Sequence, residues 1–134
     1  MTTPALLIYD RDFPRRKVSD WLLSHISGAL PPHRYKGVLT LQDECLLFQG
    51  SDTVLKTDTE IIIRKETIRQ VYYGYDKTYT IFQTRSLGLF WSPVRLELKR
   101  HSSYTTEFLY VVVGYNKTGT LNKEFYLYLT NWLG

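Results

Sequence analysis

The hydrophobic positions of the chain follow two different periods, and the change between them divides the sequence. Near the amino terminus, Val18, Leu22 and Ile26 recur every four residues, which is the spacing of one face of an amphipathic helix. This pattern predicts a helix over residues 13–29, and the proline pair at residues 31–32 predicts extended chain after it.

From Tyr35 onward the hydrophobic period is two, as in strands with one buried face. The clearest case is VRLELK at residues 94–99, where apolar and charged positions alternate without interruption. Short apolar runs separated by polar corners are typical of an antiparallel barrel or sandwich. The seven predicted strands cover residues 35–41, 45–50, 60–64, 68–73, 78–84, 94–99 and 105–113.

The last segment returns to helical spacing. One face is formed by Leu121, Phe125, Tyr128 or Leu129, and Trp132, although the stretch EFYLYLT alone is compatible with a strand. We therefore expect a mainly β fold: a barrel of seven antiparallel strands closed by a C-terminal α-helix, with an extra N-terminal helix. The expected organisation is one structural domain, with a helical extension over 1–34 and the barrel with its helix over 35–134.

Composition and charge narrow the class of protein. The 134 residues include 11 tyrosines, which favour half-buried sheet surfaces, and the net charge of +4 permits but does not demand contact with acidic lipid or nucleic acid. Cys45 is the single cysteine, so an internal disulfide and a multi-cysteine zinc site are excluded. The start of the chain lacks the basic leader of a signal peptide, and the apolar runs are short for a membrane span. A cytoplasmic protein is expected, with a peripheral location at a membrane as the alternative.

Several stretches resemble a known superfold. They are KGVLTL, ECLLFQG, IIIRKETIRQVYYG and the final helix with Trp132. Over residues 35–133 the chain resembles pleckstrin-homology-like domains, including GRAM-like and bacterial members. The resemblance implies docking to phosphoinositide head groups or to protein ligands, with basic residues of the first two strands and their loop holding phosphates. Here that loop is Gln42-Asp43-Glu44, and its acidic groups would repel a phosphate.

A substitute ligand site is predicted from the other corners. In the expected barrel, the corners at residues 42–44, 64–67 and 99–103 gather at the open end opposite the helix. A phosphate could then be held through charge-assisted hydrogen bonds; the alternative is that these charges pair with one another and solvate the loops. The candidate ligand-binding residues are Arg64, Lys65, Lys99, Arg100 and His101.

Aromatic residues supply the candidate partner-contact surface. Tyr73 and Tyr75 lie in the cluster YYGYDKTY, and Phe90 and Trp91 lie in an apolar loop. Exposed rings of this kind grip peptides or stack on bases, whereas the structural alternative is cross-strand aromatic pairing or packing back onto the sheet. A contiguous exposed apolar loop typically marks a contact surface.

No catalytic or metal-binding constellation is visible. Cys45 follows Asp43 and Glu44, an environment that disfavours a nucleophilic thiolate, and the three histidines lie far apart without a metal-ligand spacing. The sequence therefore favours a non-catalytic binding module without cofactor or metal, docking a protein partner or an acidic lipid head group. A weak nucleic-acid binder and a small enzyme with a site in the barrel mouth are the alternatives, and a homo-oligomer formed through a strand edge stays open.

Overall fold

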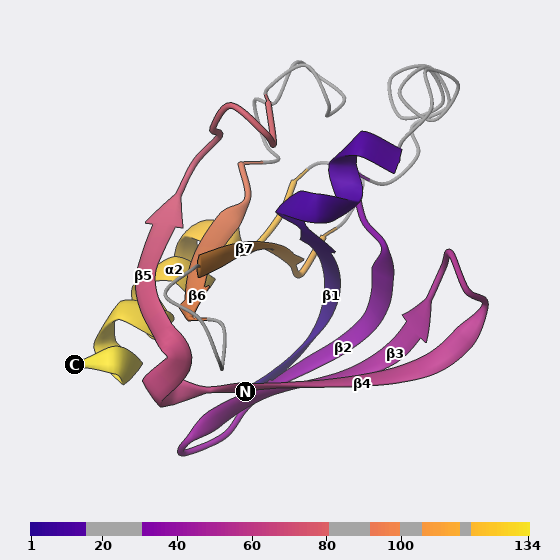
Figure 1. Cartoon of the computed structure of the whole chain (residues 1–134). Coiled ribbons are helices and arrows are strands. Elements are labelled where there is room, and N and C mark those ends of the chain that lie inside the picture. The colour runs from indigo at the N-terminus through magenta and orange to yellow at the C-terminus, as the bar shows by residue number, and fades with distance from the viewer. Residues whose placement is uncertain (16–30, 81–91, 100–105, 116–118) are drawn as a thin grey trace.

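The computed structural model describes residues 1–15, 31–80, 92–99, 106–115 and 119–134 (Figure 1). They form one seven-stranded antiparallel sheet with the strand order β4-β3-β2-β1-β7-β6-β5, followed by a C-terminal helix. The strands are β1 (Thr2–Tyr9), β2 (Tyr35–Leu41), β3 (Cys45–Asp52), β4 (Thr57–Arg64), β5 (Ile68–Tyr73), β6 (Val94–Lys99) and β7 (Thr106–Val113). The helix is α2 (Asn122–Leu133), and the 3-10 helices are η1 (Asp10–Arg15) and η2 (Lys65–Thr67).

The central strand of the sheet is one that the sequence pattern does not predict. β1 lies between β2 and β7, although no strand is expected before Tyr35. Its side chains are buried on both faces: Leu7 belongs to the main core, whereas Leu6 and Ile8 pack in clusters on the opposite face. A strand covered on both faces reads as a continuous apolar run without alternation, which is why its period gives no signal.

Two other expected elements differ from the structure. The extra N-terminal helix expected over 13–29 is not seen: residues 13–15 complete η1, and the remainder lies outside the described residues. Of the strand expected over 78–84, residues 78–80 are not in a strand. Oδ1 of Asp76 accepts hydrogen bonds of 2.8 Å from the N–H groups of Thr78 and Tyr79, and this turn replaces the start of that strand.

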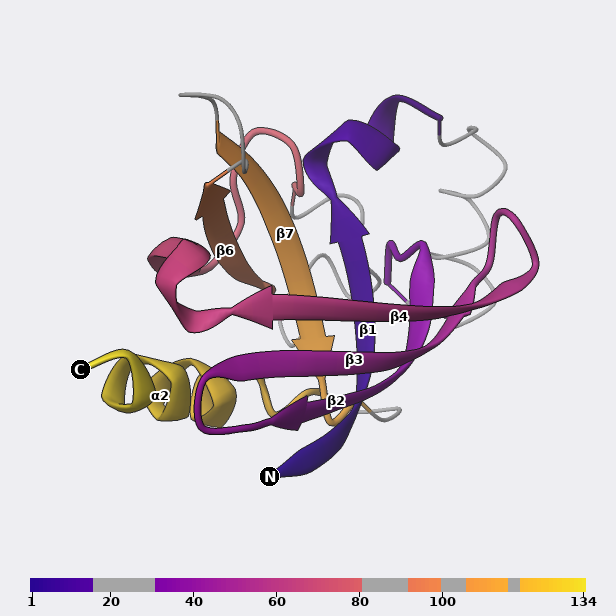
Figure 2. The same ribbon diagram turned by 60° about the horizontal axis from the view of Figure 1, so that its bottom comes forward.

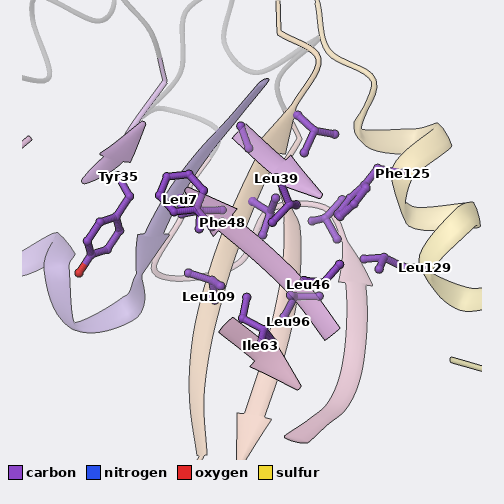
Figure 3. Packing of buried hydrophobic residues seen from close by; sticks show 14 of the residues in the cluster. Leu7, Tyr35, Leu39, Leu46, Phe48, Ile63, Leu96, Leu109, Phe125 and Leu129 are labelled. Carbon is purple, nitrogen blue, oxygen red and sulfur yellow. The ribbon is translucent and has the colours of Figure 1, made fainter. Parts of the chain in front are cut away.

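The sheet curls but is not closed into the expected barrel (Figure 2). β4 and β5 are its two edge strands, and the chain passes from one to the other through η2 without pairing them. The core is completed by the helix instead, because Phe125 and Leu129 of α2 are buried in the same cluster as residues from six strands, with partly buried residues of β5 packed against it (Figure 3). The C-terminal helix is thus confirmed, and it fills space that a closed cylinder of strands would otherwise enclose.

Close approach of β2 and β3 depends on two glycines that face each other. Gly37 pairs directly with Gly50. A Cβ atom on Gly37 would lie 2.3 Å from the carbonyl oxygen of Gln49, and a Cβ on Gly50 would lie 2.3 Å from that of Lys36. No side chain fits at either position, so the two backbones come together only because both residues are glycine.

The ends of α2 are tied to the sheet by polar contacts. At its start, the N–H of Leu121 donates to the carbonyl oxygen of Val113 at 2.9 Å. Near its end, the indole N–H of Trp132 donates to the carbonyl oxygen of Gln42 at 3.0 Å. The corner at residues 42–44 therefore lies beside the helix, not opposite it as expected. No helix in the described ranges is both long and apolar enough to span a membrane.

Candidate functional site: a pocket at the open seam of the sheet

A pocket of about 350 Å³ lies where the curled sheet fails to close. One wall comes from the end of β4 and from η2, and the other from the end of β6, the start of β7 and the end of β1. We call it the seam pocket. Its lining residues are Tyr9, Ile62, Ile63, Arg64, Thr67, Leu98, Lys99 and Glu107.

Two predicted ligand-binding cations, Arg64 and Lys99, meet in this pocket. Within the described part of the chain, neither side chain forms an ion pair. Asp20 is the only one of the 13 acidic residues outside the described ranges, so few carboxylates remain that could neutralise them. The pocket therefore presents two positive groups from opposite walls, next to the apolar side chains of Ile62 and Leu98.

The one carboxylate of the pocket wall is already engaged. Glu107 forms an ion pair with Arg11, whose guanidinium carbon lies 4.1 Å from the centre of the Tyr9 ring. Burial, followed by the negative charge of Glu107, raises the pKa of Tyr9 to about 12. The Tyr9 side chain in the pocket wall is therefore neutral at physiological pH and carries a hydroxyl group. Arg11 offsets the negative charge of Glu107.

Tyr9 is held in place by a buried ionic cluster that sequence reasoning missed. Its backbone N–H donates to Oδ2 of Asp12 at 3.1 Å, and Oδ1 of Asp12 accepts from Arg34 at 3.0 Å. Arg34 also donates to Asp52 at 2.9 Å, and this hydrogen bond is the main reason that the pKa of Asp52 is lowered. Arg34 therefore links η1 to the end of β3. No sequence motif marks this cluster, because its members come from three separated segments.

The other predicted ligand-binding residues are placed elsewhere. The ammonium group of Lys65 lies 5.1 Å from the ring centre of Trp132, in a cation–π contact with α2 rather than in the seam pocket. Arg100 and His101 lie outside the described residues. Only two of the five candidates are therefore brought together by the described structure.

The predicted aromatic contact surface is divided between two places. Tyr73 stacks on Tyr126 of α2 with ring centres 5.9 Å apart, and 38% of Tyr73 is exposed. Tyr75 instead packs against Tyr79, with ring centres 6.0 Å apart, in a cluster on the other face of the sheet. Phe90 and Trp91 lie outside the described residues. Tyr73 and Tyr75 do not form one continuous surface.

A second charged group stabilises that far-face aromatic cluster. Asp76 accepts hydrogen bonds from the hydroxyl of Tyr110 at 2.6 Å and from Arg95 at 3.0 Å. The guanidinium of Arg95 lies between the rings of Tyr72 and Phe108, with distances of 4.7 and 4.6 Å to their centres. These contacts of Asp76 and Arg95 are all made within the protein, which indicates a structural role for this cluster.

Sequence reasoning also missed two residues of the pocket wall. Tyr9 ends a strand that the pattern does not predict, and Glu107 lies on β7, whose pairing with β1 is a property of the fold. In the described ranges, no group of three or more metal-ligating side chains comes together. No protein-family model matches the chain, and no curated protein matches it.

Proposed function

We propose that this protein is a non-catalytic binding module, of the pleckstrin-homology-like kind, that docks an acidic segment of a partner protein at the seam pocket. The observation that supports it is the juxtaposition of Arg64 and Lys99 across an apolar-walled pocket, with the wall carboxylate Glu107 already paired with Arg11. A carboxylate entering between the two cations would gain charge-assisted hydrogen bonds, and its apolar neighbours would cover the exposed Ile62.

Acidic groups around the pocket favour a peptide over an anionic membrane. The carbonyl of Glu44 accepts from the N–H of Lys65 at 2.9 Å, so the acidic corner at 43–44 lies directly beside η2, which contains Glu66. These charges would oppose the dense negative surface of an acidic bilayer. A single carboxylate on a peptide can reach the two pocket cations while its apolar side chains cover the rim.

Selection from random peptides displayed on phage tests this proposal without a known partner. We expect the wild-type protein to enrich sequences in which Asp or Glu stands between apolar residues. The double variant Arg64→Ala/Lys99→Ala removes both cations of the pocket and should lose that acidic preference. The matched control Lys56→Ala/Lys123→Ala removes two exposed cations away from the pocket and should keep it.

Vesicle binding provides the contrasting outcome. In that outcome, the protein cosediments with phosphatidylserine and phosphoinositide vesicles in a way that requires Arg64 and Lys99, while the selected peptides show no acidic enrichment. That pair of results would identify a lipid head group, and not a protein segment, as the ligand of the seam pocket. If the wild type and the Arg64→Ala/Lys99→Ala variant select the same peptides, docking takes place outside the seam pocket.

A further inference from the structure

The structure assigns a second interaction surface to the free edge of β4: we propose that two copies of this chain pair their β4 strands antiparallel across a two-fold axis. The pairing places Ile62 opposite Ile62 of the second copy, and Glu60 opposite Arg64 of the second copy on both sides of the axis. This inference does not rest on the proposed function. The two surfaces share Ile62 and Arg64, so pairing of two copies would compete with peptide docking at the seam pocket.

The hydrogen-bond pattern of β4 identifies the backbone groups that face outward. The N–H of Lys65 donates to the carbonyl oxygen of Glu44 at 2.9 Å. Because hydrogen-bonded positions alternate along an antiparallel ladder, Ile63 and Ile61 also bond to β3. The N–H and C=O groups of the intervening residues Glu60, Ile62 and Arg64 therefore point away from β3. In the described part of the chain, β4 has no strand on that side.

This edge lacks the features that protect edge strands from pairing. β4 pairs with β3 in unbroken register over all eight of its residues, and its sequence TDTEIIIR contains no proline. The other edge strand, β5, is shorter, has a register shift between Ile68 and Gln70, and packs against α2. Natural sheets blunt exposed edges with bulges, prolines, charges or a covering helix. Of these protective features β4 has only charges, and in the proposed register Glu60 is complementary to Arg64 of the second copy.

Side-chain complementarity fixes the register. Ile62 is 55% exposed, and pairing it with its own copy at the axis removes this aliphatic surface from water. In that register Glu60 stands directly opposite Arg64 of the second copy, twice in one dimer. In the same register Asp58 falls opposite Glu66 of the second copy, which lies in η2, just beyond the end of the paired strand. Displacing one strand by four residues would instead place Glu60 opposite Glu60, and like charges directly opposite each other are unfavourable.

Charge exchange tests both the dimer and its register. Sedimentation velocity over a series of protein concentrations should show a reversible monomer–dimer equilibrium for the wild type. Glu60→Arg puts two arginines opposite each other at both sites, and Arg64→Glu puts two glutamates opposite each other. Each variant alone should dimerise about tenfold more weakly or worse. An equimolar mixture restores both opposite-charge pairs and should form heterodimers about as tightly as the wild type.

The mixture also controls for misfolding, because an unfolded variant cannot be rescued by another. Asp58→Arg is the matched control: it reverses a charge on the same edge but places it opposite Glu66 of the second copy, so it should not weaken dimerisation. Monomeric wild type at all concentrations, single variants that still dimerise, or a mixture that stays monomeric would each overturn the proposal. Disruption by Asp58→Arg would overturn the register.

Separate variants keep this test apart from the one for the proposed function. Lys99→Ala alters the seam pocket and leaves the paired residues of β4 intact. It should weaken acidic-peptide selection without changing dimerisation. Glu60→Arg should weaken dimerisation without weakening peptide selection, since Glu60 is not part of the pocket wall and its loss releases Arg64 from the dimer.

Discussion

The side-chain oxygen of Asn122 accepts a hydrogen bond of 2.7 Å from the backbone N–H of Val113. The side-chain nitrogen of Asn122 donates to the carbonyl oxygen of Ser92, also at 2.7 Å, and the residue is fully buried. One side chain thus joins the end of β7, the start of α2 and the segment that leads into β6. The position of the helix against the sheet depends on this junction.

Replacing Asn122 by Leu should therefore destabilise the protein strongly. The substitution leaves the N–H of Val113 and the carbonyl of Ser92 buried without their partner, which costs about 2 to 4 kcal/mol of unfolding free energy in total. Urea unfolding followed by circular dichroism measures the change. Asn131→Leu, at an exposed position of the same helix, is the control and should change stability little. Equal effects at the two positions would contradict the junction.

Gly50→Ala should be destabilising although alanine is small and apolar. Its Cβ would lie 2.3 Å from the carbonyl oxygen of Lys36, which is backbone and cannot move away alone. We expect a loss of about 2 kcal/mol or more in unfolding free energy. Ser51→Ala, at the exposed neighbouring position of β3, serves as the control in the same urea experiment. A Gly50→Ala protein as stable as Ser51→Ala would show that β2 and β3 can separate without cost.

Acid should weaken the fold through Asp76 and Asp52. Burial raises the pKa of Asp76, but hydrogen bonds from Tyr110, from backbone N–H groups and from Arg95 together lower it below its ordinary value of 3.8. The pKa of Asp52 is lowered mainly by its hydrogen bond with Arg34. A carboxyl group with a depressed pKa stabilises the folded state above the unfolded-state pKa, and this stability is lost as the pH falls through the folded-state pKa.

The corresponding experiment measures unfolding free energy against pH. Wild-type stability should fall as the pH drops below about 4, the ordinary carboxyl pKa. Asp76→Asn should lower stability at neutral pH and reduce the slope in acid, because the titrating group is gone. Asp43→Asn, in the exposed corner between β2 and β3, is the control. An Asp76→Asn profile that runs parallel to the wild type would contradict the role of this carboxylate.

Truncating Phe125 should show that α2 belongs to the core. The Phe125 side chain is 1% exposed and packs in the main cluster, so Phe125→Ala should cost about 3 to 5 kcal/mol of unfolding free energy. Tyr128→Ala truncates a ring of the same helix that is 49% exposed, and should change stability by less than about 1 kcal/mol. Thermal unfolding of the two variants gives the comparison. Similar losses would mean that the helix is only loosely attached.

Local patterns were sufficient where one face of an element is buried and the other is wet. β6 has the predicted bounds, residues 94–99, because its alternating burial matches the alternation in VRLELK. The helical face of Phe125, Leu129 and Trp132 likewise appears in α2. Arg64 and Lys99 were among the predicted ligand-binding residues because each is the last residue of a predicted strand and lies at a polar corner.

Local patterns were insufficient where burial comes from partners distant in the sequence. The apolar run of β1 has no period because the main core covers one of its faces and separate clusters cover the other. The corner at residues 42–44 was placed opposite the helix, but the hydrogen bond from Trp132 brings the helix to Gln42. The seam pocket depends on two features that were not predicted: Tyr9 ends the unpredicted strand β1, and the gap exists only because the sheet stays open instead of closing into a barrel.

The amino-acid sequence by itself determined the mainly β character, most strand positions after Tyr35 and the closing helix, because these follow from the alternation of apolar and polar side chains along neighbouring residues. Only the tertiary structure decided the central place of β1, the open seam between β4 and β5, and the meeting of Arg64 with Lys99. The physical reason is that strand order and closure depend on contacts between residues far apart in the chain, which no local period encodes.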